Sequence, residues 1–300
     1  MIEGGNKYER MRWVCGSILP ALILLVAIVF LPIIYAVTLS FFDKSAFNPD
    51  MTWAGLKNFS WLLKDPDLWL SFGRSTFFTL GTVSMQLAWG LFFALLLNRN
   101  MHGQGIFRAL VIMPYLLPTI VVGLLFKWML NPEYGIVNQV LMDIGLIDLP
   151  INFLGSLNGA MYSLIGVTVW QYGSFAALMI LARLQSINPH LYEAAKVSGA
   201  GPLRCFWDVT LPNLRTTLLM LALLRGIWMF NKFDIIFLTT GGGPLQATET
   251  LPLYAYRLAF EDFDFGRAAA ACTIMFAVLV VGSIFYFRKF DPSREVEVGR

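Results

Sequence analysis

Residues 13–42 read WVCGSILPALILLVAIVFLPIIYAVTLSFF and contain no charged side chain. A helix needs about 20 apolar residues to cross the roughly 30 Å hydrocarbon core of a bilayer, where it satisfies its own backbone polar groups. The stretch therefore predicts a membrane-spanning helix over residues 14–40. A secretory signal has an apolar region of only about 7–15 residues, followed by a cleavage site of small residues. This run continues past Phe30 without such a site, so we expect it to be retained as an anchor.

The whole chain shares this apolar character. Of its 300 residues, 57% are apolar and 14% are charged, against about 45–50% and about 25% in soluble domains. The net charge of +3 is too small to indicate a nucleic-acid partner. The cysteines and histidines lack the spacing of a zinc site or a disulfide framework; they are Cys15, Cys205, Cys272, His102 and His190. We therefore expect no metal site and no binding of nucleic acid.

Further apolar stretches predict the remaining spans. Five intervals are long and free of charge, and a sixth is apolar but interrupted by Arg225, Lys232 and Asp234. The predicted fold is an all-α polytopic membrane protein with six transmembrane helices, at about residues 14–40, 75–98, 107–129, 160–184, 216–238 and 268–287. No linker or internal repeat is visible, so we expect one transmembrane domain over residues 1–300.

The distribution of basic residues predicts the orientation. Six spans place both termini on the same side of the membrane. If that side is the cytoplasm, the cytoplasmic segments hold 13 Lys and Arg residues and the outer segments hold seven. This excess follows the positive-inside rule. A five-span chain would leave Arg288 and Lys289 outside, so we expect six spans and two cytoplasmic termini.

A polar segment at residues 188–212, which we name the elbow, separates the fourth and fifth predicted spans. Asn188 can cap a helix that starts with a proline, and Gly199 can supply the left-handed residue that ends it. Pro202 can begin a second short helix, and Pro212 is expected to close it. The small residues of this glycine corner either admit the backbone of another protein or pack as an ordinary loop on the chain's own bundle.

The elbow resembles a motif of a known family. Glu193, Ala194, Ala195, Gly199 and Gly201 are similar to the EAA loop of the permease subunits of binding-protein-dependent ABC importers. The resemblance implies that the elbow is a cytoplasmic coupling helix that docks in a cleft of an ATPase. Two positions depart from the family pattern: Ser198 stands where Asp is usual, and Thr216 stands where Pro is common.

The segment after span five extends the resemblance to the MalF-like carbohydrate-uptake permeases, through Thr240, Gly242, Gly243, Pro244, Thr248, Thr250, Leu251, Tyr254, Tyr256, Ala259 and Phe260. It implies five partners: a second, MalG-like permease subunit, a cytoplasmic ABC ATPase dimer, an extracytoplasmic sugar-binding protein, a sugar and the lipid bilayer. The implied location is the bacterial cytoplasmic (inner) membrane. The chain has no GxxxxGK[ST] sequence for binding nucleotide phosphates, so we expect a subunit that is not an enzyme and needs no cofactor.

Prolines in span three point to a substrate path. Pro114 and Pro118 each remove a backbone donor, and broken helices at membrane depth are tolerated where they line a cavity. Tyr115 and Thr119 place hydroxyl groups one turn apart at this kink. The alternative is that the prolines only bend the helix around its neighbours. In the family that the chain resembles, these positions face the translocation path.

Spans four and five hold the other candidate site residues. On a continuous helix, Lys232 returns to within about 20° of Arg225, with Trp228 and Met229 on the same stripe and Asp234 roughly opposite. These residues either form ion pairs that hold the bundle together or contact a sugar. Span four adds polar residues that the family resemblance also places around the sugar site, namely Thr168, Gln171 and Tyr172. The two neighbouring cations favour an anionic sugar, such as a uronate, phosphate or sulfonate.

The resulting interpretation is an ATP-driven ABC importer subunit that translocates a sugar or sugar derivative. An ion-coupled secondary transporter is the alternative, with Arg225, Lys232 and Asp234 as its coupling charges. Such a carrier would need no ATPase and would leave the elbow without a role.

Overall fold

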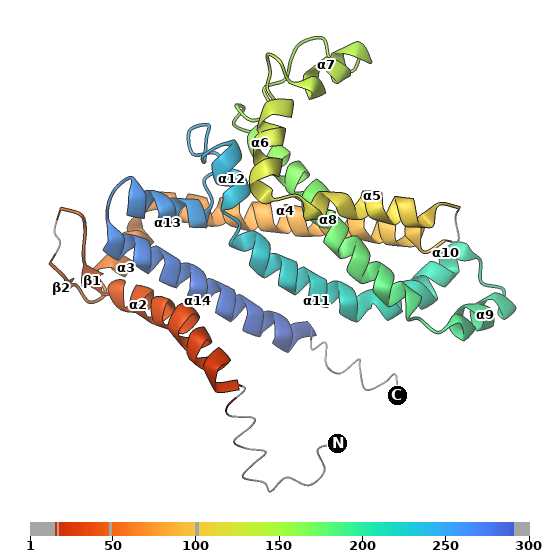
Figure 1. Cartoon of the computed structure of the whole chain (residues 1–300), viewed down its shortest axis with the longest axis horizontal. Helices are drawn as coiled ribbons and strands as arrows, with labels where there is room; N and C mark the ends of the chain where they lie inside the picture. Colours follow the sequence, from red (N-terminus) through yellow and green to blue (C-terminus); the bar gives the residue numbers. More distant parts are fainter. Residues whose placement is uncertain (1–15, 17, 48–49, 100–101, 291–300) are drawn as a thin grey trace, which may run out of the picture. The chain divides into compact units, whose positions relative to one another are not determined.

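The computed structural model describes residues 16, 18–47, 50–99 and 102–290, which are mostly helical (Figure 1). The described residues form two compact units, which we treat separately. One comprises the chain up to Pro66 together with Ala255–Ala277, and the other comprises Asp67–Tyr254 together with the chain from Val278 onward. The elements are η1 (Val26–Phe30), α2 (Leu31–Leu39), β1 (Phe42–Asp43), β2 (Thr52–Trp53), α3 (Lys57–Lys64), α4 (Pro66–Leu97), α5 (Gln104–Leu116), α6 (Thr119–Met129), α7 (Ile136–Asp143), α8 (Gly159–Gln185), α9 (Pro189–Val197), α10 (Pro202–Cys205), η2 (Phe206–Thr210), α11 (Leu211–Phe230), α12 (Asp234–Thr239), α13 (Leu251–Phe260) and α14 (Phe265–Phe290).

In the first unit, a two-stranded sheet and a buried asparagine connect the helices. Strands β1 and β2 pair antiparallel, with Phe42 opposite Trp53. The side-chain amide of Asn58 in α3 donates to the carbonyl groups of Ser40 and Phe42. These bonds satisfy the backbone where the chain leaves the apolar helix Ile18–Leu39 and turns back.

The second unit is a bundle around α4, α8 and α11. Helix α5 packs against α8, and α6 packs against α12 (Figure 1). Buried aliphatic side chains at the end of this bundle that leads to the elbow form one cluster, made of Ala94, Leu97, Ile180, Leu181, Leu184, Ile187, Leu214 and Leu221. The elbow is therefore anchored on a packed apolar base.

Among the described residues, four single helices are long and apolar enough to cross a membrane, namely Ile18–Leu39, Pro66–Leu97, Gly159–Gln185 and Phe265–Phe290, and a bent pair of helices can count as a fifth. The four single helices coincide with the predicted spans 14–40, 75–98, 160–184 and 268–287, apart from residues 14, 15 and 17, which lie outside the described residues. The all-α polytopic fold is thereby confirmed. The count of six spans and the single domain stay predictions.

The predicted span 107–129 is bent at its prolines, and whether the bent pair crosses the membrane as one span stays a prediction. Helices α5 and α6 meet at an angle of 94° at Leu117 and Pro118. Leu117 is extended, with ψ 133°, because a residue that precedes proline is disfavoured in the helical region. Pro114 lies inside α5 without ending it. One of the two prolines therefore makes the break.

The helix assumed to be unbroken over the predicted span 216–238 is interrupted, and the span itself stays a prediction. Helix α11 ends at Phe230, and α12 begins only at Asp234. The placement of Asp234 opposite Arg225 assumed an unbroken helix, and it fails here: Lys232 Nζ lies 2.9 Å from Asp234 Oδ1.

Pro212 does not close the second elbow helix, contrary to the prediction. Residues 202–230 are helical throughout. The π-helical turn η2 directly precedes the first turn of α11, where Pro212 has no backbone N–H to donate.

Candidate functional site

The break between α11 and α12 opens a cavity of about 390 Å³ in the second unit. Its walls come from α8, from the end of α11, from the non-helical residues that follow and from the start of α12. The lining residues are Tyr172, Arg225, Trp228, Met229, Asn231, Lys232, Phe233 and Asp234. We name this the polar cavity, because it gathers charged and aromatic side chains inside an otherwise apolar bundle.

One wall of the polar cavity is a hydrogen-bonded chain. The Lys232 ammonium donates to the Tyr172 hydroxyl at 2.6 Å and pairs with Asp234. The Tyr172 hydroxyl also shares a hydrogen bond of 2.9 Å with Thr119 Oγ1. The bend at Pro118 places Thr119 at the start of α6, within reach of α8. The bend predicted at the prolines of span three and the unpredicted break after Phe230 therefore meet in one network.

The other wall is a buried arginine. Arg225 has 0% exposure, and its Nε donates to Gln86 Oε1 of α4 at 2.8 Å. Its guanidinium carbon lies 4.8 Å from the ring centre of Tyr172 and 5.4 Å from that of Trp228. A charge at membrane depth costs about 2.5–3.5 kcal/mol on insertion scales, which the amide and the two ring faces partly offset.

Five of the nine predicted substrate residues line the polar cavity, namely Tyr172, Trp228, Met229, Lys232 and Asp234. Thr119 joins them through the Tyr172 hydroxyl. Tyr115 lies beside them, with its ring centre 6.1 Å from that of Tyr172. Thr168 and Gln171 are buried and bond to the carbonyl groups of Leu164 and Leu117. These two residues support the site from behind.

Sequence reasoning missed Gln86 and left open whether Arg225 is structural. The amide nitrogen of Gln86 also lies 3.4 Å from the Thr168 carbonyl and 3.6 Å from Met229 Sδ, so this one side chain joins α4, α8 and α11. The sequence offered one signal for this role, because Gln86 is a polar amide within a span that contains no charged residue. Such a side chain needs a buried partner.

We predict that Gln86→Leu destabilises the protein, because it leaves the Arg225 Nε buried without an acceptor. The expected loss in free energy of unfolding is about 1–3 kcal/mol, measured as a lower melting temperature in detergent. The matched control is Gln139→Leu, because the exposed Gln139 amide contacts only Asp143 of its own helix. An equal melting temperature for Gln86→Leu and the wild type would contradict the prediction.

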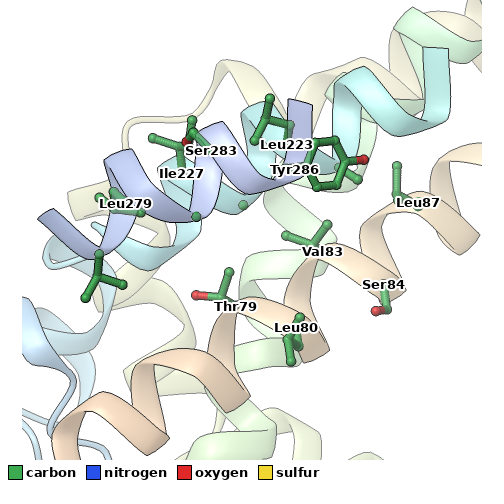
Figure 2. Close-up of a pocket in the computed structure, with 14 residues that line it drawn as sticks. Thr79, Leu80, Val83, Ser84, Leu87, Leu223, Ile227, Leu279, Ser283 and Tyr286 are labelled. Carbon is green, nitrogen blue, oxygen red and sulfur yellow. The ribbon is translucent and has the colours of Figure 1, made fainter. Parts of the chain in front are cut away.

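A second hollow, of about 460 Å³, lies between α4, α11 and the end of α14 (Figure 2). Every side chain that lines it is uncharged, and most are aliphatic. Tyr286 is the largest of them, and its hydroxyl is already donated to the Leu219 carbonyl at 2.8 Å. A sugar needs several convergent donors and acceptors. The polar cavity, which offers them, is therefore the candidate substrate site.

The elbow contains the helix cap predicted at Asn188 and the left-handed turn predicted at Gly199. Asn188 accepts a hydrogen bond from the backbone N–H of His190, and α9 runs from Pro189 to Val197. Gly199 has φ +81°. The N–H groups of Gly199 and Ala200 donate to the carbonyl groups of Lys196 and Ala195, which is the Schellman pattern of helix ends. Gly199 is therefore required by the turn itself.

The outer surface of the elbow is exposed and partly apolar. Val197 is 90% exposed, and Leu203 is 73% exposed. The Glu193 side chain is 67% exposed and has one described partner, His190, at 2.9 Å. A Cβ added at Gly201 would meet nothing within 4 Å. Neither packing nor backbone conformation within the described chain therefore requires the small residue at position 201.

Comparison with known proteins gives a family match over the part of the chain that holds both sites. Residues 86–296 match the family described as binding-protein-dependent transport system inner membrane component. The chain is 33% identical over 282 residues to the trehalose/maltose transport system permease protein MalF of Thermococcus litoralis, covering 94% of this chain and 95% of that protein. It is 36% identical over 270 residues to the sulfoquinovosyl glycerol transport system permease protein SmoG of Agrobacterium fabrum, with 90% and 87% covered.

A solved structure has the same fold. The crystal structure of a bacterial ABC transporter involved in the import of the acidic polysaccharide alginate contains a chain that superimposes with a TM-score of 0.83. The alignment covers 96% of this chain and 98% of that chain at 23% sequence identity. At that level of identity, the similarity shows the fold alone.

Proposed function

This chain belongs to the family of binding-protein-dependent transport system inner membrane components, and we propose that it is the transmembrane subunit of an ATP-driven sugar importer. The observation that carries the proposal is the match over residues 86–296, because this range contains the polar cavity and the elbow together. The relatives named above are permeases of trehalose/maltose and sulfoquinovosyl glycerol transport systems. A sugar or sugar derivative is therefore the proposed substrate.

The polar cavity is the proposed point of sugar passage. Sugars present both apolar ring faces and many hydroxyl groups. Trp228, which is 45% exposed, and Tyr172 offer aromatic faces. Lys232 and Asp234 offer a donor and acceptors beside them. A few placed polar groups in an aromatic-lined cleft are typical of small-molecule sites.

The elbow is the proposed contact with a separate ATPase, so this chain itself hydrolyses no ATP. Its exposed Val197 and Leu203 and its open Gly201 support a close-fitting protein partner. When the ATPase dimer closes on ATP, it would displace α9 and, through the continuous helix of residues 202–230, move the wall of the polar cavity. A second permease subunit and an extracytoplasmic sugar-binding protein complete the proposed complex, with both termini of this chain in the cytoplasm.

Gly201→Trp tests this docking. Because a larger side chain at position 201 meets nothing in the described chain, the variant should fold and reach the membrane normally. We expect it to lose at least about 10-fold in copurified ATPase, equivalent to about 1.4 kcal/mol of docking energy. The readout is the amount of nucleotide-binding subunit recovered with the tagged chain from membranes.

The matched control is Gly105→Trp, at a second exposed position where an added Cβ meets nothing within 4 Å. We expect the control to retain the ATPase. Full recovery of the ATPase with Gly201→Trp would contradict docking at the elbow, and recovery of no ATPase with the wild type would contradict the proposed function.

A further inference from the structure

The polar cavity carries an excess positive charge. Its lining includes three charged side chains, which are Arg225, Lys232 and Asp234. Lys232 and Asp234 lie 2.9 Å apart and neutralise each other. No carboxylate of the described residues pairs with Arg225, whose contacts are the Gln86 amide, the Met229 sulfur and aromatic rings. The described walls therefore hold one cation without a counter-charge.

The end of the Arg225 side chain has no strong acceptor. A guanidinium has five N–H donors in a planar fork. Nε is used by Gln86, and Nη2 lies 3.8 Å from Met229 Sδ, a weak acceptor. Nη1 is buried and has no hydrogen-bond partner. Since buried donors are nearly always satisfied in folded proteins, Nη1 is free to bond an acceptor that comes from outside the described chain.

We infer that the importer selects sugars that carry an oxyanion, and that Arg225 is the residue that binds this group. The inference rests on the proposed function and names its substrate class. A carboxylate, sulfonate or phosphate supplies the missing negative charge and matches the fork of a guanidinium. The rings of Tyr172 and Trp228 flank the Arg225 guanidinium and offer the sugar ring apolar faces. Lys232 is assigned no such role, because Asp234 already neutralises it.

The test measures binding to the assembled complex of this chain with its second permease and ATPase, purified in nanodiscs. The probes are glucuronate, galacturonate and mannuronate, each compared with its neutral hexose, with thermal stabilisation as the readout. We expect at least one uronate to reach half-saturation at a concentration about 10- to 100-fold lower than its hexose. This is the size of effect given by one charge-assisted hydrogen bond. Parity in all three pairs would overturn the inference.

Three variants assign the preference to Arg225. Arg225→Gln should bring the preferred pair to parity, and Arg225→Lys should retain part of the preference because the charge remains. Asp234→Asn should increase the preference, because it removes the only carboxylate of the described lining. This opposite direction keeps the assignment testable if Arg225→Gln fails to assemble. Retention of the full preference by Arg225→Gln, or a reduced preference in Asp234→Asn, would overturn it.

Two further measurements separate binding of a sugar from binding of any anion, and failure of this inference from failure of the proposed function. Inorganic sulfate alone should stabilise the complex less than the preferred uronate does, and equal stabilisation would overturn the assignment to a sugar. ATP hydrolysis stimulated by the sugar-loaded binding protein reports on the proposed function independently. Parity of the probe pairs with stimulated hydrolysis intact would overturn this inference and leave the importer standing.

Discussion

Glu193→Lys abolishes ATP-driven uptake while the complex still assembles in the membrane, if the elbow is the coupling element. Among the described residues, the change disturbs only the exposed contact with His190, and exposed ion pairs contribute about 0–1 kcal/mol. Its effect must therefore arise at the partner, where we propose that Glu193 meets a basic group, which the reversed charge repels. Uptake falls to background, while the amount of chain in the membrane stays near the wild-type level.

The matched control is Glu133→Lys, the same reversal at an exposed glutamate between α6 and α7. Radiolabelled sugar uptake into cells, normalised to the amount of membrane-inserted chain, measures both variants. We expect the control to retain uptake. Wild-type uptake by Glu193→Lys would show that the elbow does not transmit the work of the ATPase.

Lys232→Met lowers sugar uptake about 10- to 100-fold, which is the second large effect that the structure predicts. The Lys232 side chain is 13% exposed, and its ammonium bonds both Tyr172 and Asp234. Removing it leaves the Asp234 carboxylate without its cation inside the cavity. Removing one partner of a buried ion pair is costly, whereas removing both partners is often nearly neutral. Because Asp234 is partly exposed, we expect Lys232→Met to lose only about 1–2 kcal/mol in free energy of unfolding.

The double variant Lys232→Met/Asp234→Leu separates the two interpretations of this pair. If the pair only holds the bundle together, the double variant recovers both the melting temperature and the uptake. If the pair contacts the sugar, the double variant recovers the melting temperature and uptake stays low. We expect the second outcome, and recovery of uptake would limit Lys232 and Asp234 to a structural role.

Local signals predicted the straight spans and the elbow well. The span expected at 160–184 is α8 at Gly159–Gln185, because hydropathy and chain length are properties of that segment alone. The cap at Asn188 and the left-handed Gly199 were predicted for the same reason. The family match covers the elbow, whose assignment as an EAA loop stays a prediction.

The cavity was harder to predict, because its geometry depends on breaks and on distant partners. Residues 231–233 contain neither glycine nor proline, so nothing local marked the end of α11. The acceptor for Arg225 is Gln86, which lies 139 positions away in the chain. A helical wheel therefore listed residues around 225–234 that line the polar cavity but placed Asp234 away from Lys232, which it contacts. Only tertiary packing brings it to Lys232.

The central claim is that a separate ATPase drives this chain, and transport in proteoliposomes tests it most directly. The wild-type complex is reconstituted with sugar-loaded binding protein on one side and ATP on the side of the elbow, with and without ionophores. We predict that sugar accumulates only when ATP and binding protein are both present, at the same rate after ion gradients are dissipated. Accumulation that follows an imposed ion gradient without nucleotide would contradict the account and favour the ion-coupled carrier.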